Sequence, residues 1–316
     1  MKILVTGSIA YDLLLHYDGS FAKSIDPAHL EELSMAFVTP RFAKHHGGTA
    51  ANIAWNLRLL NQVPLVVGSV GDDGGEYLSL LEGRGIGVEY IDRLPKHATS
   101  TAIVATDSHE RQITFYHPGA DAHGTWPEKL LDEREEISFA IVSPRDPQMM
   151  LKACDWCIKY GIQYLFDPGQ NMMAFGQEEL LHALRGSRGV ICNAYEWQLL
   201  SQRTGFSTDA MLQETHLIVI TTGENGLSIH TEKNNIVLPA CKADKVLNPT
   251  GAGDALRAGF LTGLSQGWNL NQSGQLGASL ASFVVEQDGT LLDYIDLGHV
   301  LGRAEVTYGE ALPVLT

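Results

Sequence analysis

The sequence predicts an α/β protein with a mostly parallel central sheet, helices on both faces of that sheet, and a small β-sheet lid. Short apolar runs alternate with segments of helical periodicity through most of the 316 residues, which is the pattern of βαβ units. Two segments contain strand-like runs with no helix between them. The composition, 44% hydrophobic and 19% charged, is that of a globular chain long enough for a large domain and a small addition.

The apolar runs have the length and composition of strands that are buried on both faces. In sheets of this kind ligands bind beyond the carboxyl ends of the strands. The predicted strands are ILVTGS (3–8), PLVVGSVG (64–71), FAIVS (139–143), YLFD (164–167), GVICN (189–193) and LIVITTG (217–223). Helices are predicted at 49–61, 74–84, 147–160, 195–204 and 208–214. The uncharged stretch 258–285 is interrupted by Gly and polar residues, so it is predicted to form two packed helices rather than a membrane span.

Residues 13–46 and 100–117 depart from the alternation. They contain the strand-like runs LLLHYDG, SMAFVTP, STAIVATD and RQITFYH, which could form a small antiparallel sheet, a lid over the strand ends. The α/β body would then comprise residues 1–12, 47–99 and 118–316. Such a sheet has an exposed face and edges that favour pairing with a second copy, so a homodimer through the lid is expected.

The net charge of −15 argues against nucleic acid or an anionic membrane as a partner. Any bound phosphate must therefore be held locally, by backbone amides, a few cations or a metal ion. The start, MKILVTGSIAYD, has the pattern of a buried strand and turn rather than of a signal peptide, so a cytoplasmic protein is expected.

Two pairs of potential metal ligands are predicted to be structural. The four cysteines suit a reducing compartment. Cys154 and Cys157 form a C-x-x-C inside an amphipathic helix and are expected to pack in the core. His45 and His46 are neighbours on an extended strand, so their side chains should point to opposite faces.

Residues 248–260, NPTGAGDALRAGF, join a glycine-rich turn to the start of an apolar helix. Gly251, Ala252 and Gly253 leave backbone amides bare at the positive end of the helix, which makes the turn attractive to anions. Asp254, itself an anion, stands at the same helix start. It is either an ordinary helix cap or a carboxylate that takes part in chemistry beside an anion site.

The stretch HHGGTAANIAWNLRLL at 45–60 has the features of a ligand-binding turn. Gly47 and Gly48 allow a ligand to approach the main chain at a helix start, and the amide of Asn52 can both donate to and accept from a hydroxyl. Asp12, after the first strand, could accept hydrogen bonds from neighbouring sugar hydroxyls. The alternative is a tight turn with two surface polar residues.

Two further stretches follow buried strands. In NAYEW, Asn193 and Glu196 lie on one face of a helix start, where an amide and a carboxylate suit water-mediated Mg²⁺; the alternative is a cap with an exposed Glu. TTGENG at 221–226 could border a nucleotide, although glycine-rich turns between strands are common. The chain has no P-loop motif, no protein-kinase motif set, no G-x-G-x-x-G after a strand and no G-x-S-x-G.

The order of these motifs, GGTAAN near residue 50, N-x-x-E near 195 and NPTGAGD near 250, resembles the PfkB/ribokinase family of carbohydrate and nucleoside kinases over nearly the whole chain. Within that family TGSIAYD, TFYHPGA, DPGQ and NAYEWQLL are most similar to bacterial adenosine kinases of the mycobacterial type. The resemblance implies a ribokinase-like fold with a β-sheet lid, ATP and Mg²⁺ as cosubstrates, and purine salvage by phosphorylation of adenosine at its 5′-hydroxyl to give AMP.

The same resemblance implies a role for each motif. The turn of Gly251, Ala252 and Gly253, with the Asp254 amide, would cradle the transferring phosphoryl group. The Asp254 carboxylate would act as general base and take the proton of the acceptor hydroxyl. Glu196 and Asn193 would organise Mg²⁺ and its waters. The residues implied to border ATP are Asn193, Thr222, Gly223 and Gly226.

On the acceptor side, the residues implied to bind the sugar are Ser8, Asp12, Gly47, Gly48 and Asn52. Phe115 and Tyr116 lie in the lid segment where the adenosine kinases place an aromatic ring against the base. Adjacent residues of a strand face opposite sides, so only one of the two can face the base. The alternative for either ring is packing within the lid.

One position departs from the family pattern. Many members carry Asp at the start of the NPTGAGD motif and bind a potassium ion in that region, whereas this chain has the neutral Asn248, so a monovalent cation requirement stays open. Two rival functions also stay open. One is a kinase of the same family that acts on ribose, fructose or another nucleoside; the other is a non-catalytic nucleoside or sugar sensor, although the chain keeps Asp254 and Glu196.

Overall fold

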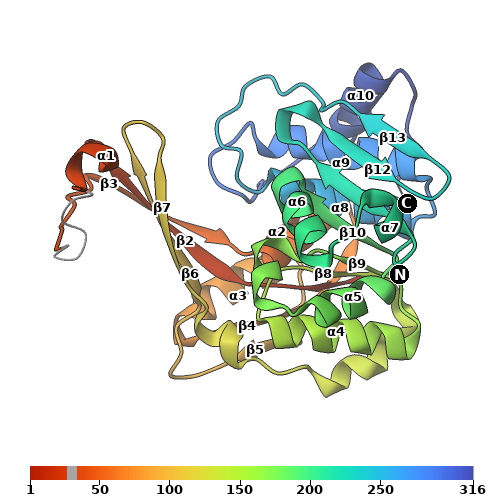
Figure 1. The fold of residues 1–316 in the computed structure, drawn as a ribbon, viewed down its shortest axis with the longest axis horizontal. Coiled ribbons are helices and arrows are strands. Elements are labelled where there is room, and N and C mark those ends of the chain that lie inside the picture. Colours follow the sequence, from red (N-terminus) through yellow and green to blue (C-terminus); the bar gives the residue numbers. More distant parts are fainter. Residues whose placement is uncertain (27–33, 316) are drawn as a thin grey trace.

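A nine-stranded sheet runs through the larger part of the molecule (Figure 1). The computed structural model describes residues 1–26 and 34–315. The strand order is β13-β12-β11-β10-β9-β8-β1-β4-β5; neighbours pair in parallel from β11 to β5, while β12 is antiparallel to β11 and β13. The strands are β1 (Lys2–Thr6), β4 (Val63–Val70), β5 (Ile91–Arg93), β8 (Ile137–Val142), β9 (Tyr164–Phe166), β10 (Gly189–Asn193), β11 (Ile218–Thr221), β12 (Leu227–His230) and β13 (Asn235–Leu238).

Helices cover both faces of this sheet, so the predicted fold class is confirmed. One apolar core lies between the sheet and α2 (Thr49–Leu59), α3 (Gly75–Gly83), α8 (Ala252–Ser265), α9 (Leu270–Val284) and α10 (Leu297–Tyr308). A second core lies under α4 (Pro147–Tyr160), α5 (Gln177–Arg185), α6 (Ala194–Thr204) and α7 (Thr208–Leu212). The stretch 258–285 forms most of α8 and α9, which confirms the prediction of two packed helices.

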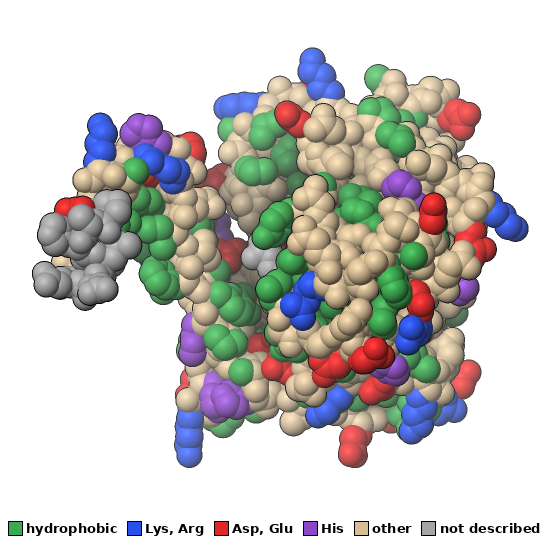
Figure 2. All heavy atoms as spheres, viewed as in Figure 1, with side chains coloured by type: hydrophobic (Ala, Val, Ile, Leu, Met, Phe, Trp, Pro, Cys, Tyr) green, Lys and Arg blue, Asp and Glu red, His purple; other side chains and the backbone are tan. Residues whose placement is uncertain are grey.

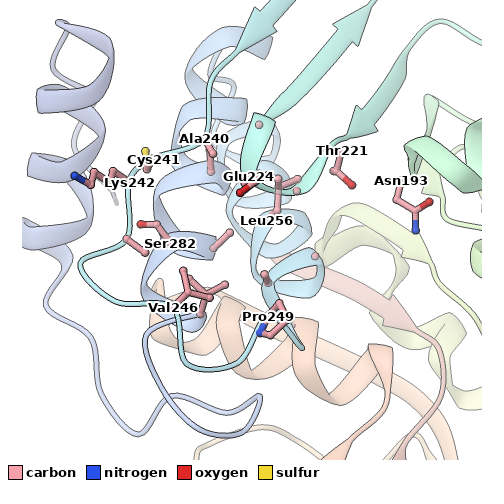
Figure 3. Close-up of a pocket in the computed structure, with 18 residues that line it drawn as sticks. Asn193, Thr221, Glu224, Ala240, Cys241, Lys242, Val246, Pro249, Leu256 and Ser282 are labelled. Atoms are coloured by element: carbon pink, nitrogen blue, oxygen red, sulfur yellow. The ribbon is translucent and has the colours of Figure 1, made fainter. Parts of the chain in front are cut away.

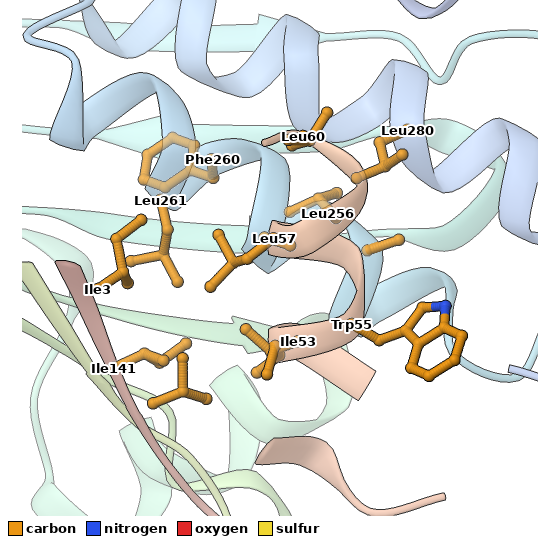
Figure 4. Close-up of a cluster of buried hydrophobic side chains, with 14 of the residues drawn as sticks. Ile3, Ile53, Trp55, Leu57, Leu60, Ile141, Leu256, Phe260, Leu261 and Leu280 are labelled. Carbon is orange, nitrogen blue, oxygen red and sulfur yellow. The ribbon is translucent and has the colours of Figure 1, made fainter. Parts of the chain in front are cut away.

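The first core ties the functional helices to the sheet. Leu57 of α2 and Leu261 of α8 lie next to each other in this core, which also contains Leu280 of α9 (Figure 4). Helices α8 and α9 touch through their backbones, because a β-carbon on Gly259 would lie 2.6 Å from the Cα atom of Gly277. The start of α8 is therefore held firmly against the body.

A separate four-stranded sheet projects from the body, in the order β3-β2-β6-β7 (Figure 1). Its strands are β2 (Ala10–Tyr17), β3 (Arg41–Gly47), β6 (Ser100–Asp107) and β7 (Gln112–His117), and the short helix α1 (Phe21–Ser24) lies near its outer end. The space-filling view shows the molecule hollowed between this sheet and the body (Figure 2). Part of the predicted lid segment 13–46, residues 27–33, lies outside the described residues.

Two details of the predicted lid are wrong. The sheet is mixed rather than antiparallel, because β2 and β6 leave the body side by side and pair in parallel. The run SMAFVTP at 34–40 contains no strand; the strand is the more polar RFAKHHG at 41–47, which pairs with β2 at the edge of the sheet. The apolar residues of SMAFVTP were the reason for predicting a strand there. An edge strand that is exposed to solvent does not need such residues.

Cys154 and Cys157 lie fully buried in the second core, as the sequence predicts for packing residues. Burial raises the pKa of the Cys154 thiol to about 12 and also raises that of Cys157. In the described part of the chain, no helix combines the length and apolar character needed to cross a membrane.

Candidate active site

The glycine-rich turn of NPTGAGD opens helix α8 at the carboxyl ends of the strands. Gly251, the residue before the helix, has φ of 85°, a left-handed conformation that glycine adopts without strain. The side chain of Asn248 accepts a hydrogen bond from the Thr250 amide (2.9 Å) and shapes the loop that leads into the turn. The Ala252 amide makes a long bond to the Pro249 carbonyl (3.3 Å).

The next two amides, of Gly253 and Asp254, have no protein acceptor within the described residues. Free amides at the positive end of a 14-residue helix form a site for an anion such as a phosphoryl group. A side chain does not fill this turn, because its residues are glycine or alanine.

The carboxylate of Asp254 on α8 contacts the side chain of Asn52 on α2. Asn52 Nδ2 donates to Asp254 Oδ2 over 2.8 Å. The Thr290 hydroxyl, shared between Asn52 Oδ1 (3.1 Å) and the His46 carbonyl (2.9 Å), fixes the orientation of that amide. Burial raises the pKa of Asp254 to about 7, although Arg257 and the Asn52 hydrogen bond lower it. Asp254 therefore holds its proton to a much higher pH than an exposed carboxyl does.

Asp12 lies beside the two glycines of the GGTAAN motif. A β-carbon on Gly47 would lie 2.3 Å from Asp12 Oδ2, so only glycine leaves room for this carboxylate. Gly48 has φ of 90°, and a β-carbon there would meet the Ala10 amide at 2.6 Å. Burial raises the pKa of Asp12, which also acts electrostatically on Asp254.

Ser8 has a structural contact at the same place. Its hydroxyl oxygen accepts a hydrogen bond from the Thr49 amide (3.2 Å) at the start of α2. Ser8 is almost fully buried, and this hydrogen bond stabilises the turn that carries Gly47 and Gly48. A direct contact with a sugar remains a prediction for this residue.

The pairing of the projecting sheet separates Phe115 from Tyr116. Residues paired directly across strands share a face. Tyr116 pairs with Ala102, which pairs with Asp12, so the Tyr116 ring lies on the face that carries Asp12. Phe115 belongs to the opposite face with Ile103. Both rings are more than half exposed, so neither is buried in a lid core.

A cavity of about 800 Å³ opens on the other side of the glycine-rich turn (Figure 3). Its floor includes Ala252 and Gly253, and its far wall is formed by small residues of α9. Asn193, Gly223 and Gly226, predicted to border a nucleotide, line it. The other lining residues are Thr221, Glu224, Ala240, Cys241, Lys242, Ala243, Val246, Pro249, Leu256, Ala278, Ala281, Ser282 and Val285.

Asn193 and Glu196 form a reciprocal cap at the start of α6. Asn193 Oδ1 accepts from the Glu196 amide and Glu196 Oε2 accepts from the Asn193 amide, both over 2.8 Å. The simple cap described as the alternative is thus present, but Glu196 is buried rather than exposed. Burial raises the pKa of its carboxyl. Among the described residues, no three His, Cys, Asp or Glu side chains gather as a metal-binding cluster.

The arrangement combines an anion-binding turn, a carboxylate beside it, a polar cleft on one side and a large cavity on the other. The family model of pfkB carbohydrate kinases matches residues 2–296. The chain belongs to this family. PfkB enzymes are phosphotransferases that act on hydroxyl groups, so the predicted family and enzyme class are confirmed.

Several proteins resemble this PfkB chain along most of their length. A nucleoside kinase of Methanocaldococcus jannaschii is 32% identical over 309 residues, which cover 96% of this chain and 97% of that protein. A nucleoside kinase of Methanothermobacter thermautotrophicus is 28% identical and covers 99% of this chain, with 98% of its own length aligned. An ATP-dependent 6-phosphofructokinase of Thermoanaerobacterium thermosaccharolyticum is 26% identical, with 83% of this chain and 85% of its own covered.

Solved structures of nucleoside kinases also resemble this chain along nearly their whole length. The nucleoside kinase of Burkholderia thailandensis in complex with inosine superposes with a TM-score of 0.86 at 29% identity, covering 98% of this chain and 99% of that one. The Methanocaldococcus jannaschii nucleoside kinase, described as an archaeal member of the ribokinase family, has a TM-score of 0.83 at 28% identity and covers 96% and 98%. The ribokinase-like fold of this PfkB chain is therefore established.

Thr222, which the sequence predicts beside ATP, lies in the turn after β11. Thr222 does not line the cavity; its amide (2.8 Å) and hydroxyl (3.0 Å) donate to the Gly226 carbonyl and close the turn after β11. Its neighbour Thr221 lines the cavity instead. Thr221 is the last residue of β11, whereas Thr222 already belongs to the turn, where its two hydrogen bonds hold it.

Sequence reasoning missed two groups of residues. The cavity wall at 240–246 and on α9 is built mostly from small and apolar side chains, together with Lys242, and these residues carry no recognisable motif. The second group is a buried ion pair behind the turn, Arg257 with Asp167. Arg257 stands inside the GAGDALRAGF motif, and a charged residue in an otherwise apolar helix was the available signal.

Proposed function

We propose that the protein is a nucleoside kinase that transfers the γ-phosphoryl group of ATP to the 5′-hydroxyl of adenosine and forms AMP. The observation that carries the proposal is the shared face of Tyr116 and Asp12 on the projecting sheet, with Asp254 within electrostatic reach of Asp12. These three side chains match the three parts of a nucleoside. Tyr116 would contact the base, Asp12 the sugar hydroxyls and Asp254 the reacting 5′-hydroxyl.

In the proposed reaction Asp254 accepts the proton of the 5′-hydroxyl while the hydroxyl oxygen forms a bond to the γ-phosphorus of ATP. The bond between the γ-phosphorus and the oxygen that bridges it to the β-phosphate breaks, and ADP leaves. The pKa of about 7 that burial gives Asp254 suits a general base at neutral pH. The free amides of Gly253 and Asp254 stabilise the negative charge on the phosphoryl oxygens during the transfer. ATP occupies the cavity of about 800 Å³, whose floor is the same turn.

The donor set at the edge of the cavity fits a magnesium ion held mainly by nucleotide phosphates and water. Glu196 uses one carboxylate oxygen in the cap of α6, so the other oxygen and the Asn193 side-chain amide group remain to orient water molecules. When bound, the ion would neutralise charge on the phosphates. The Asn248 oxygen is engaged with the Thr250 amide, which supports the proposal that no tightly held monovalent cation is needed.

The names of the relatives support a nucleoside rather than a free sugar, since two of the whole-length relatives and the inosine-bound structure are nucleoside kinases. Inosine is the nearest competitor of adenosine because the two bases differ at one ring position. We also propose that the enzyme is a cytoplasmic homodimer that pairs through the projecting sheet and serves purine salvage.

One experiment separates these possibilities from the rival sugar kinase and the non-catalytic sensor. ADP release is measured with adenosine, inosine, guanosine, ribose and fructose as acceptors. Base stacking on an aromatic ring contributes ~1–3 kcal/mol, which corresponds to roughly 5- to 150-fold, so adenosine should exceed ribose in kcat/KM by about that factor. Equal rates with ribose or fructose would replace the nucleoside proposal with a sugar kinase, a higher rate with inosine would replace adenosine, and no turnover with any acceptor would favour the sensor.

A further inference from the structure

A buried ion pair lies directly behind the turn that carries Asp254. Arg257, one helical turn further along α8, donates through Nε and Nη2 to the two carboxylate oxygens of Asp167, over 2.6 and 2.8 Å. Its third nitrogen, Nη1, donates to the Gly253 carbonyl over 3.1 Å. Arg257 is 8% exposed and Asp167 is 1% exposed. Asp167 follows β9, so the pair joins the sheet to the peptide that precedes Asp254.

The charge of Asp254 is influenced from several elements at once. Arg257 favours the ionised carboxylate, as does the hydrogen bond from Asn52, while the negative charges of Asp167 and Asp12 oppose it. Glu196 lies close enough to act on Arg257. The groups involved are Arg257 on α8, Asp167 after β9, Asp12 on β2, Asn52 on α2, Tyr77 on α3 and Glu196 on α6.

We propose that Arg257 and Asp167 are positioning residues that hold the Gly253–Asp254 turn in place and act in opposite directions on the charge of the Asp254 carboxylate. This inference rests on the proposed function, in which Asp254 is the general base. Neither residue of the pair needs to touch the nucleoside.

The physical reason lies in the balance of the charges. An unopposed arginine beside Asp254 would stabilise the carboxylate and weaken it as a base. Without an arginine, burial would keep Asp254 protonated at neutral pH, and a protonated carboxyl cannot accept the hydroxyl proton. The bidentate bond to Asp167 neutralises part of the guanidinium charge, so the pair keeps Asp254 between these two extremes.

A pair with a merely structural role, joining α8 to β9, would also be buried and bidentate. Breaking a buried pair destabilises the fold whichever partner is removed, so loss of stability does not discriminate. The direction in which the pH profile moves does discriminate, because the two charges have opposite signs.

The test measures kcat/KM for adenosine against pH, at saturating ATP and Mg²⁺, for wild type, Asp167→Asn, Arg257→Met and the double variant. Asp167→Asn should move the acidic limb of the profile to lower pH by about one unit, and Arg257→Met should move it to higher pH by about one unit. The double variant, which has lost both charges, should lie between them. Titration of ATP is common to all four proteins and cancels in the comparison.

Arg257→Lys serves as the conservative variant. It keeps a positive charge but cannot bond both oxygens of Asp167 and the Gly253 carbonyl. Its acidic limb should therefore stay closer to wild type than that of Arg257→Met, while kcat falls because the turn is held less firmly. Thermal unfolding of each variant identifies any protein that does not fold, and if Arg257→Met does not fold, Asp167→Asn and Arg257→Lys carry the test.

Suppose that Asp254→Asn is inactive, but the acidic limbs of Asp167→Asn and Arg257→Met move in the same direction or do not move. That result would overturn the inference and leave the proposed function standing. An Asp254→Asn variant that retains activity would instead overturn the role of Asp254 itself. The two failures are therefore distinguishable.

Discussion

Asp254 differs in two features from an ordinary helix-start aspartate. It is largely buried, which raises its pKa to about 7, and it accepts a hydrogen bond from Asn52. An exposed capping aspartate keeps a pKa near 4 and is fully ionised at neutral pH. The raised pKa is what the proposed general base requires, and it gives this residue consequences for both rate and stability.

Replacing Asp254 with Asn should abolish most of the turnover. Asn can still accept the hydrogen bond from Asn52 through its oxygen, but it cannot take a proton, so kcat should fall about 10²–10⁴-fold while adenosine binding changes little. Steady-state kinetics and isothermal titration with adenosine measure the two effects. Asp296→Asn is the matched control, because Asp296 caps α10 by accepting from the His299 amide. A variant at position 254 with more than about a tenth of wild-type kcat would contradict the role of a base.

Asp254→Asn should also increase the stability of the folded protein at neutral and alkaline pH, but not at acidic pH. The pKa of Asp254 is higher in the folded protein (about 7) than the ordinary value of 3.8, so the folded state binds this proton more tightly than the unfolded state does. Wild type therefore loses stability as pH rises from about 4 to 7. Asp254→Asn removes that loss, so its Tm should exceed that of wild type at pH 8 and match it near pH 4. The same difference in Tm at both pH values would contradict the assignment of the raised pKa.

The residues of the site differ in how far the sequence alone could predict them. Asp254, Asn52 and Asp12 lie in or beside short motifs whose chemistry is local, so the sequence alone identifies each as a candidate. The bond between Asn52 and Asp254 joins residues 202 positions apart, and the pair of Arg257 with Asp167 joins residues 90 positions apart. Contacts of that separation depend on how α2, α8 and β9 pack together, and a single sequence does not contain that information.

At the scale of single elements, strand β7 separates two aromatic residues that the sequence could not tell apart. Tyr116 shares a face with Ala102 and Asp12, and Phe115 shares the opposite face with Ile103 and Leu13. The alternation of a strand was predicted, but its register was not, because register depends on the neighbouring strands.

Tyr116→Ala should raise the KM for adenosine and narrow the difference in kcat/KM between adenosine and ribose by about tenfold or more. Phe115→Ala should leave both values close to wild type, because its ring lies on the face away from Asp12. Both rings are exposed to a similar degree, so the pair is a matched comparison. A larger kinetic effect at Phe115 than at Tyr116 would reverse the assignment of the two faces.

The cap of α6 allows the proposed metal role of Glu196 to be tested without unfolding the helix start. Glu196→Gln keeps an oxygen that can accept from the Asn193 amide but removes the charge. The Mg²⁺ concentration for half-maximal rate should rise, while KM for adenosine stays constant. Glu179→Gln in α5 is the control, because Glu179 makes the same type of cap with the Gly176 amide (2.8 Å). An unchanged Mg²⁺ dependence would leave Glu196 with a capping role alone.

At the scale of the whole molecule, the sequence predicted the strand–helix alternation and the separate sheet, and both follow from local periodicity. It did not predict that β2 and β6 are parallel or that β3 is the polar segment 41–47. Both errors concern a sheet that projects from the body. Such a sheet is not buried on both faces, so burial does not dictate its sequence pattern.

The face of this sheet that lies opposite Asp12 exposes apolar side chains, among them Phe42 (63% exposed) and Phe115 (66%). Leu13, Leu15 and Ile103 lie on the same face. An exposed apolar face of this kind suits a protein interface, so the chain should elute as a dimer. Phe42→Asp should convert it to a monomer of 34.4 kDa, as measured by light scattering. A wild-type protein that is already monomeric at micromolar concentration would contradict the proposed dimer.

The backbone contact between Gly259 and Gly277 limits which mutations the enzyme can tolerate. Any side chain at Gly259 has to displace α9, because the β-carbon would lie 2.6 Å from the Gly277 Cα atom. Helix α9 also supplies Ala278 and Ala281 to the wall of the large cavity, while α8 begins at the turn that carries Asp254. One added methyl group would therefore disturb the wall of this cavity and the turn that carries Asp254 together. The limit on side-chain size at Gly259 and Gly277 therefore couples the shape of this cavity to the position of Asp254.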